Sequence, residues 1–110
     1  MRLMTLVVLG CTSVLVWIVP ISVVGTDEAV LTVSFLDVGQ GDAVLIESPT
    51  GTQLLVDGGR DSAVLQALGR ELPFFDRDLD YVVATHPDHD HIGGLVAVLE
   101  RFQVHNVLFT

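Results

Sequence analysis

The chemistry of this chain is concentrated in one stretch of ten residues, Thr85-His86-Pro87-Asp88-His89-Asp90-His91-Ile92-Gly93-Gly94. It holds five potential metal ligands in six consecutive positions, between a short apolar run and a helix-like apolar pattern. Residues two apart in an extended segment project to the same side, so His86 and Asp88 can converge on one ion. Asp90 and His91 stand at the predicted turn into a helix and can face a second ion.

Imidazole and carboxylate ligands of this kind suit Zn²⁺, Mn²⁺ or Fe. Two such ions about 3.5–4 Å apart can hold a water nucleophile and the oxygens of a phosphoryl or carbonyl group. A loop without metal is the alternative, because Asp90 is a good helix N-cap and Pro87 and the two glycines favour turns. His89 is out of step with the ligand pattern and His105 stands alone on a predicted strand, so neither is assigned a role.

Apolar periodicity on both sides of this stretch predicts alternating strands and helices. Strands are predicted over residues 30–37, 43–47, 53–56, 79–84 and 104–109, and amphipathic helices over 61–72 and 92–102. Glycine-containing turns join the first three strands, which predicts an antiparallel meander. The order βββαβαβ indicates an α/β fold with a mixed sheet and helices packed on it.

The first 25 residues are predicted to form a transmembrane anchor. Residues 3–24 carry no charge and as a helix would span roughly 33 Å, which is enough to cross a bilayer. One arginine precedes this run and two acidic residues follow it, so we expect the remaining domain on the extracytoplasmic side of the cell membrane. A signal peptide is the alternative, although the run is longer than the 7–15 residues typical of one. A lipoprotein interpretation of Cys11 is weaker, because the apolar run continues past it.

Composition limits the remaining domain, over residues 30–110, to one small unit or a piece of a larger one. The whole chain has 14 acidic residues against 5 arginines, and its formal net charge is −9. Nucleic-acid surfaces need clustered cations, so this balance argues against one. The excess of carboxylates suits a metal site better, with a solvated acidic surface as the alternative. The single cysteine excludes a disulfide within the chain.

Three motifs carry a resemblance to a known family. They are Phe-Leu-Asp-Val-Gly-Gln-Gly-Asp-Ala at 35–43, Leu-Val-Asp-Gly-Gly at 55–59, and the stretch at 85–94. The last resembles the His-x-His-x-Asp-His signature of metallo-β-lactamase-fold hydrolases, with Asp88 in place of the second histidine. The three together, in this order, are similar to the exported C-terminal domain of ComEC-type competence proteins, which form the inner-membrane channel for DNA uptake. The resemblance covers about residues 31–110.

The resemblance implies a pair of divalent ions, Mn²⁺ or Zn²⁺. His86 and Asp88 would hold the first ion, while Asp90 and His91 would hold the second. Asp90 would also be the catalytic residue that orients or deprotonates the bridging water. The hard oxygen ligand of Asp88 favours Mn²⁺.

Residues outside this stretch are also expected near the ions. Asp57 matches the aspartate that supports the metal-binding loop by hydrogen bonds in this fold, with a plain strand-ending turn as the alternative. Gly39 and Gly41 would let a backbone turn approach the site closely, with Gln40 and Asp42 as candidate contacts.

The resemblance also implies that the chain is incomplete. The full fold is an αββα sandwich of two similar halves, and this sequence supplies the first half. No residue after His91 can fill the roles of the later histidine, bridging aspartate and final histidine, so we expect a fragment or truncated reading frame whose C-terminal half or partner chain is missing.

Three hypotheses follow for the function. The first is a metal-dependent hydrolase, such as a nuclease acting on DNA during uptake. The second is a non-catalytic membrane component of a DNA-uptake channel. The third is a truncated, inactive chain with exposed sheet edges. We favour the first for the parent protein and the third for the isolated polypeptide.

Overall fold

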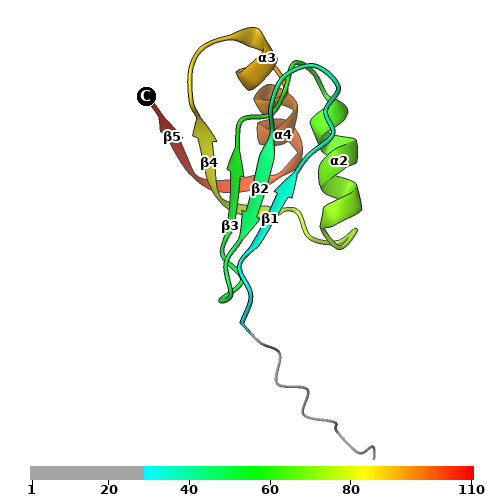
Figure 1. The fold of residues 1–110 in the computed structure, drawn as a ribbon, viewed down its shortest axis with the longest axis vertical. Helices are drawn as coiled ribbons and strands as arrows, with labels where there is room; N and C mark the ends of the chain where they lie inside the picture. Colours follow the sequence, from blue (N-terminus) through cyan, green and yellow to red (C-terminus); the bar gives the residue numbers. More distant parts are fainter. Residues whose placement is uncertain (1–28) are drawn as a thin grey trace, which may run out of the picture.

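The computed structural model describes residues 29–110, in which five strands form a single mixed sheet with three helices (Figure 1). The strands are β1 (Thr32–Phe35), β2 (Val44–Glu47), β3 (Gln53–Val56), β4 (Asp78–Ala84) and β5 (Gln103–Phe109). The helices are α2 (Ala63–Glu71), α3 (His89–Ile92) and α4 (Leu95–Arg101). The predicted anchor at 1–25 lies outside the described residues, and none of the helices within 29–110 is long and apolar enough to cross a membrane.

The strands lie side by side in chain order, from β1 to β5. The pairs β1–β2 and β2–β3 are antiparallel, as the sequence predicts, because short turns join them. The pairs β3–β4 and β4–β5 are parallel, because a helical segment carries the chain back across the sheet before each new strand. The predicted mixed sheet is therefore confirmed, and β3 and β4 end at the same edge.

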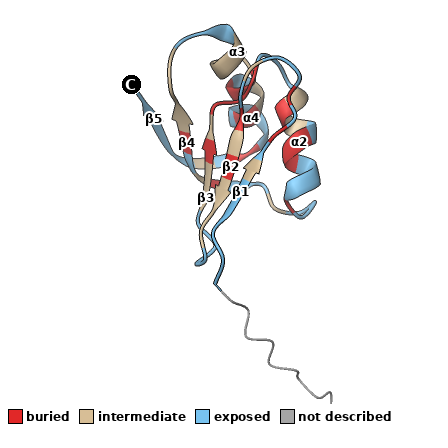
Figure 2. Ribbon diagram, viewed as in Figure 1, coloured by how far each residue is buried: buried red, intermediate tan, exposed pale blue. Residues whose placement is uncertain are grey.

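One face of the sheet packs against α2 and α4 and contains the hydrophobic core (Figure 2). The strand register aligns Leu45, Leu55 and Val82 in one row, and all three are fully buried. Val64 of α2 and Val98 of α4 are fully buried in the same cluster. Burying a side chain of this size contributes about 1.5–3 kcal/mol, so these residues help to hold the helices against the sheet.

The opposite face of the sheet carries a second apolar row. The register aligns Phe35, Val44, Val56, Val83 and Leu108 across all five strands. Phe35 is 83% exposed and Leu108 is 52% exposed, and the other three are half-buried. The helices of the described residues lie on the other face, so this row has no covering layer within 29–110.

The helix predicted over residues 92–102 is wrong in its bounds. Two helices occupy this region, and the first begins at His89. Gly93 and Gly94 separate them where the chain after β3 passes close by, with the Gly94 N–H donating to the Gly59 carbonyl at 2.9 Å. Asp90 therefore lies inside α3 instead of capping it, and the N-cap position belongs to Asp88, which makes no side-chain cap hydrogen bond.

One smaller expectation also needs correction. The apolar pattern at 92–102 predicts that Leu95, Val98 and Leu99 share one buried side of the helix, but Leu99 is 49% exposed. At the start of α2, Ser62 takes the N-cap position without a side-chain bond, and the carboxylate of Asp61 accepts the Ala63 N–H at 2.9 Å.

Candidate metal centre

Three loops meet at the edge of the sheet where β3 and β4 end. They follow β1, β3 and β4, and each carries one of the three sequence motifs. Backbone hydrogen bonds hold them together. The Gly58 N–H donates to the His91 carbonyl at 2.7 Å, which joins the loop after β3 to α3. The Gly59 N–H donates to the Asp42 carbonyl at 2.9 Å and the Arg60 N–H donates to the Gln40 carbonyl at 3.2 Å, which joins the same loop to the loop after β1. The carboxyl ends of parallel strands are the usual place for sites in sheets of this kind.

Gly41 is the position at which the first loop comes closest to the third. Its φ of +98° is a conformation that side chains disfavour, and a Cβ there would lie 1.6 Å from the Asp90 carbonyl oxygen. Gly39 also has a positive φ, of +76°, but an added Cβ would meet nothing within 4 Å. The close approach therefore depends on Gly41, and Gly39 supplies only the turn.

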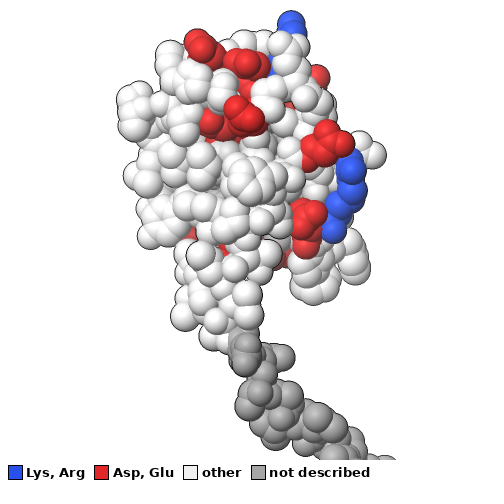
Figure 3. Space-filling model, in the orientation of Figure 1, with Lys and Arg blue, Asp and Glu red and all other residues white. Residues whose placement is uncertain are grey.

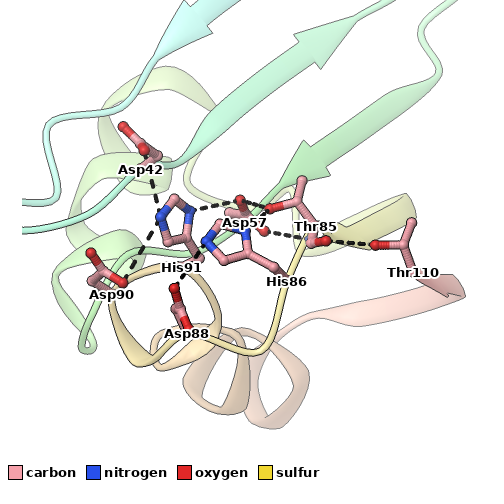
Figure 4. Close-up of polar contacts among 8 residues, drawn as sticks. All are labelled: Asp42, Asp57, Thr85, His86, Asp88, Asp90, His91 and Thr110. Carbon is pink, nitrogen blue, oxygen red and sulfur yellow. Dashed lines mark hydrogen bonds and ion pairs between the residues drawn. The ribbon is translucent and has the colours of Figure 1, made fainter.

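Asp57 ties the end of β3 to the end of β4. The residue is only 4% exposed, and its φ of +58° is uncommon for a residue other than glycine. The Thr85 N–H donates to Oδ1 at 2.9 Å, and the Thr85 hydroxyl donates to Oδ2 at 2.6 Å. His91 Nδ1 lies 3.0 Å from Oδ2 (Figure 4). One buried carboxylate therefore accepts three hydrogen bonds from the stretch at 85–94.

These hydrogen bonds determine which nitrogen of each histidine carries a proton. The Thr85 hydroxyl has a single proton, which goes to Asp57, so in its 2.9 Å contact with His86 Nδ1 the imidazole must be the donor. His91 Nδ1 likewise donates to Asp57. In their neutral forms both rings therefore carry the proton on Nδ1, which leaves the Nε2 lone pairs free to bind an ion.

Each free Nε2 lies next to carboxylate oxygens. His86 Nε2 is 3.4 Å from Asp88 Oδ2, and His91 Nε2 is 3.9 Å from Asp90 Oδ1 and 3.8 Å from Asp42 Oδ2. Two ligands that share an ion at about 2.0–2.2 Å lie roughly 3–4 Å apart. The spacing thus fits one ion per histidine and carboxylate pair.

The two candidate ion positions are close neighbours. The imidazole rings of His86 and His91 have centroids 3.9 Å apart, with a tilt of 49° between them. The four ligands predicted from the sequence are thus gathered on one side of the β4–α3 loop (Figure 4). Their assignment as ligands stays a prediction.

The electrostatics of this cluster favour a bound cation. The hydrogen bond with Asp57 raises the pKa of His91 above its ordinary value; partial burial opposes this, and the charges of Asp90, Asp57 and Asp42 add to it. Burial alone would raise the pKa of Asp57, but hydrogen bonds from Thr85 and His91 bring it below its ordinary value. Figure 3 shows acidic side chains gathered at this end of the molecule. Either a proton or a metal ion on Nε2 would offset this negative charge.

A different set of ligands is suggested by proximity alone. One side-chain atom each of Asp57, His86 and His91 lies within 4.8 Å of the others. Both oxygens of Asp57 already accept hydrogen bonds from Thr85 or His91. We therefore assign Asp57 to holding the histidines in place and not to binding an ion directly.

The donor set and its position at the strand ends can be compared with known proteins. The family model described as "Metallo-beta-lactamase superfamily" matches residues 36–109. The chain belongs to this superfamily. No curated protein matches it. Members of the metallo-beta-lactamase superfamily usually bind divalent metals, and the described residues form a hydrolase domain of that superfamily.

Some contributors to the site in this superfamily member were not expected from the sequence. Thr85 was assigned no role, although its place directly before the first histidine put a hydroxyl group beside the ligands. Gln40, expected near the ions, accepts a hydrogen bond from Arg60, and its place beside an ion stays a prediction. The unassigned His89 is exposed, and His105 pairs with Asp78 at 3.0 Å on the surface.

Proposed function

We propose that this protein is a metal-dependent hydrolase of the ComEC-like type, which cleaves phosphodiester bonds and is linked to DNA uptake in transformation. The observation that carries the hydrolase part is the pairing of each free histidine Nε2 with a carboxylate, at 3.4 Å for His86 and Asp88 and 3.9 Å for His91 and Asp90. Two adjacent ions, Mn²⁺ or Zn²⁺, fit this arrangement.

Each residue of the candidate site has its own role in this proposal. Bound ions would supply Lewis acidity and a water of lowered pKa. His86 and Asp88 hold one position, and His91 and Asp90 hold the other. Asp90 is 42% exposed at its side chain, so it can also accept a proton from a water or orient it toward the substrate. Asp57 keeps both histidines in the tautomer that binds metal.

The link to DNA uptake rests on the three motifs at 35–43, 55–59 and 85–94, which together resemble the ComEC-type domain. We propose in addition that residues 1–25 anchor the protein in the cell membrane, with the hydrolase domain on the extracytoplasmic side. DNA is the proposed substrate, and the membrane is the proposed partner. The apolar character of residues 3–24 supports the anchor.

A further segment or partner chain is part of this proposal. Among residues 92–110 the only histidine is His105, which is paired with Asp78 and not with the His86 and His91 cluster. The apolar row on the uncovered face of the sheet supports the same idea, because sheets of this class are packed on both faces. The remaining ligands would then come from the covering layer.

The second candidate function is a non-catalytic component of a DNA-uptake channel. The position of His105 away from the cluster favours it, since the described residues then supply only part of a two-ion site. Under this alternative the metal-binding loop would still fold and hold an ion, but no hydrolysis would follow.

The test uses the purified full chain in detergent. Metal content is measured by mass spectrometry, and hydrolysis is measured with bis(p-nitrophenyl) phosphate. We expect near-stoichiometric Mn or Zn, lost in the Asp90→Ala, His91→Ala double variant, and, when the covering segment or partner chain is supplied, hydrolysis that is lost in Asp90→Asn. Asp78→Asn, on a surface carboxylate, is the matched control. Metal without hydrolysis would favour the second candidate function, and a folded chain without metal would refute the proposal.

A further inference from the structure

We propose that Arg60 binds one phosphate group of the substrate beside the metal-binding loop. This inference rests on the proposed function and names the chemical group recognised at the same site. It begins from a cleft of about 300 Å³ that is lined by Gln40, Arg60, Asp88, His89 and Asp90. Two of these residues are predicted ligands, so whatever occupies the cleft lies beside the ions.

Two hydrogen bonds to Gln40 hold the backbone and the guanidinium of Arg60 in place. Its backbone N–H donates to the Gln40 carbonyl at 3.2 Å, and its guanidinium Nη1 donates to the Gln40 side-chain oxygen at 2.6 Å. A guanidinium has five N–H donors, and one is used here. Among residues 29–110 it makes no other hydrogen bond and no ion pair, although Asp88 and Asp90 line the same cleft. The charge is thus held in place and remains available to a ligand.

The guanidinium of Arg60 favours an oxyanion as the ligand of the cleft. A guanidinium matches the geometry of phosphate through two parallel hydrogen bonds. Asp88 and Asp90 would repel an anion on their own, but bound divalent ions would offset their charge. Arg60 would then donate hydrogen bonds to the phosphate oxygens.

The distribution of the other cations limits how much of the substrate is recognised. Arg70 lines a separate pocket with Asp37 and Glu71, and Arg77 and Arg101 share a third pocket with Phe102. None of them lines the cleft at Arg60. The described residues therefore offer a contact to one phosphate and not to a run of them, which favours a chain end or short phosphodiester over an extended polynucleotide.

The first experiment measures phosphate affinity by isothermal titration calorimetry on the full chain, with and without Mn²⁺. The probe is inorganic phosphate. We expect Arg60→Gln to weaken binding about tenfold to hundredfold, Arg60→Lys to weaken it less, and Arg70→Gln to leave it unchanged. Metal content should be equal in all four proteins, because Arg60 holds no ion.

The outcomes separate this inference from the proposed hydrolase. If metal does not bind but the metal-free chain binds phosphate through Arg60, the hydrolase proposal fails and the phosphate site stands. If Arg60→Gln binds phosphate within twofold of the wild type, or the wild type binds none in either form, the phosphate site is refuted.

A second measurement tests the limit of one phosphate. The affinities of a thymidine dinucleotide and a twenty-residue oligothymidine are compared over a range of salt concentrations. We expect similar affinities and a shallow salt dependence, with a logarithmic slope of about −1. Much tighter binding of the longer strand, with a slope of several units, would overturn the limit.

Discussion

Replacing Asp57 with asparagine preserves the shape of the side chain but removes its charge and one acceptor oxygen. The Thr85 N–H can still donate to the remaining oxygen, whereas the Thr85 hydroxyl and His91 Nδ1 would face an amide NH₂. Hydrogen bonds to a charged acceptor contribute about 1.5–3 kcal/mol each, and two of the three are lost at a nearly buried position. We expect the free energy of unfolding to fall by about 3 kcal/mol, which is a large part of the stability of a small domain.

The same substitution should also weaken metal binding. Asp57 accepts from His91 Nδ1 directly and reaches His86 only through the Thr85 hydroxyl, which donates to Asp57 and accepts from His86 Nδ1. Without this carboxylate both histidines lose their preference for the tautomer with a free Nε2, so metal affinity should fall about tenfold to hundredfold. Urea unfolding followed by circular dichroism measures the stability, and calorimetric titration with Zn²⁺ measures the affinity. Asp78→Asn is the matched control, because Asp78 also contacts a histidine nitrogen at 3.0 Å but lies on the surface. An Asp57→Asn protein with wild-type metal affinity would refute the tautomer argument.

Three further predictions concern the glycine turn, pH and the metal. Gly41→Ala should prevent metal binding and lower the urea midpoint, because its Cβ would collide with the Asp90 carbonyl. Gly39→Ala should have a much smaller effect, since its Cβ would meet nothing within 4 Å. Equal effects of the two substitutions would contradict the close approach of Gly41 to Asp90. In the metal-free chain, the Asp57 carboxylate contributes its full stabilisation above pH 3.8, its ordinary pKa, and this stabilisation is lost as the pH falls through its lower pKa in the folded state. Protonated His91 contributes its full stabilisation below pH 6.5, its ordinary pKa, and this stabilisation is lost as the pH rises through its higher pKa in the folded state. Urea midpoints should therefore decline above pH 6.5, and Asp57→Asn should flatten that decline. Removing metal with EDTA should lower the melting temperature of the wild type, and an unchanged Tm would count against a site that binds only the folded state.

Much of the fold follows from local patterns in the sequence. The third strand is predicted at its observed bounds, because Gln53–Val56 lies between two turns rich in glycine. The antiparallel meander follows from the short turns, and the parallel pairs follow from the helices between strands. The helix bounds after β4 are missed because the prediction follows the apolar pattern from residue 92 to 102. In the structure Gly93 and Gly94 separate two helices, at the point where the Gly94 N–H donates to the distant Gly59 carbonyl. The residue pattern within a short stretch of sequence cannot show that contact, because its two glycines lie far apart along the chain.

The candidate site is predicted less evenly. The four ligands are adjacent in sequence, so their clustering needs only the local geometry of a strand followed by a turn. Asp57 is expected by resemblance, but its hydrogen bonds to Thr85 and His91 span 28 and 34 residues. The pairing of Arg60 with Gln40 spans 20 residues and depends on how two loops pack, which composition alone does not reveal.

The three hydrogen bonds at Asp57 have a consequence for how substitutions combine. Thr85 passes the influence of Asp57 on to His86, so the carboxylate and the hydroxyl act on the same proton arrangement. Once Asp57→Asn has removed the acceptor, Thr85→Val should have little further effect. The loss of metal affinity in the double variant should therefore be smaller than the sum of the losses in the two single variants. A double-mutant cycle would express this as a coupling energy between the ends of β3 and β4. Once either residue has changed, a change at the other position should therefore cost little more metal affinity.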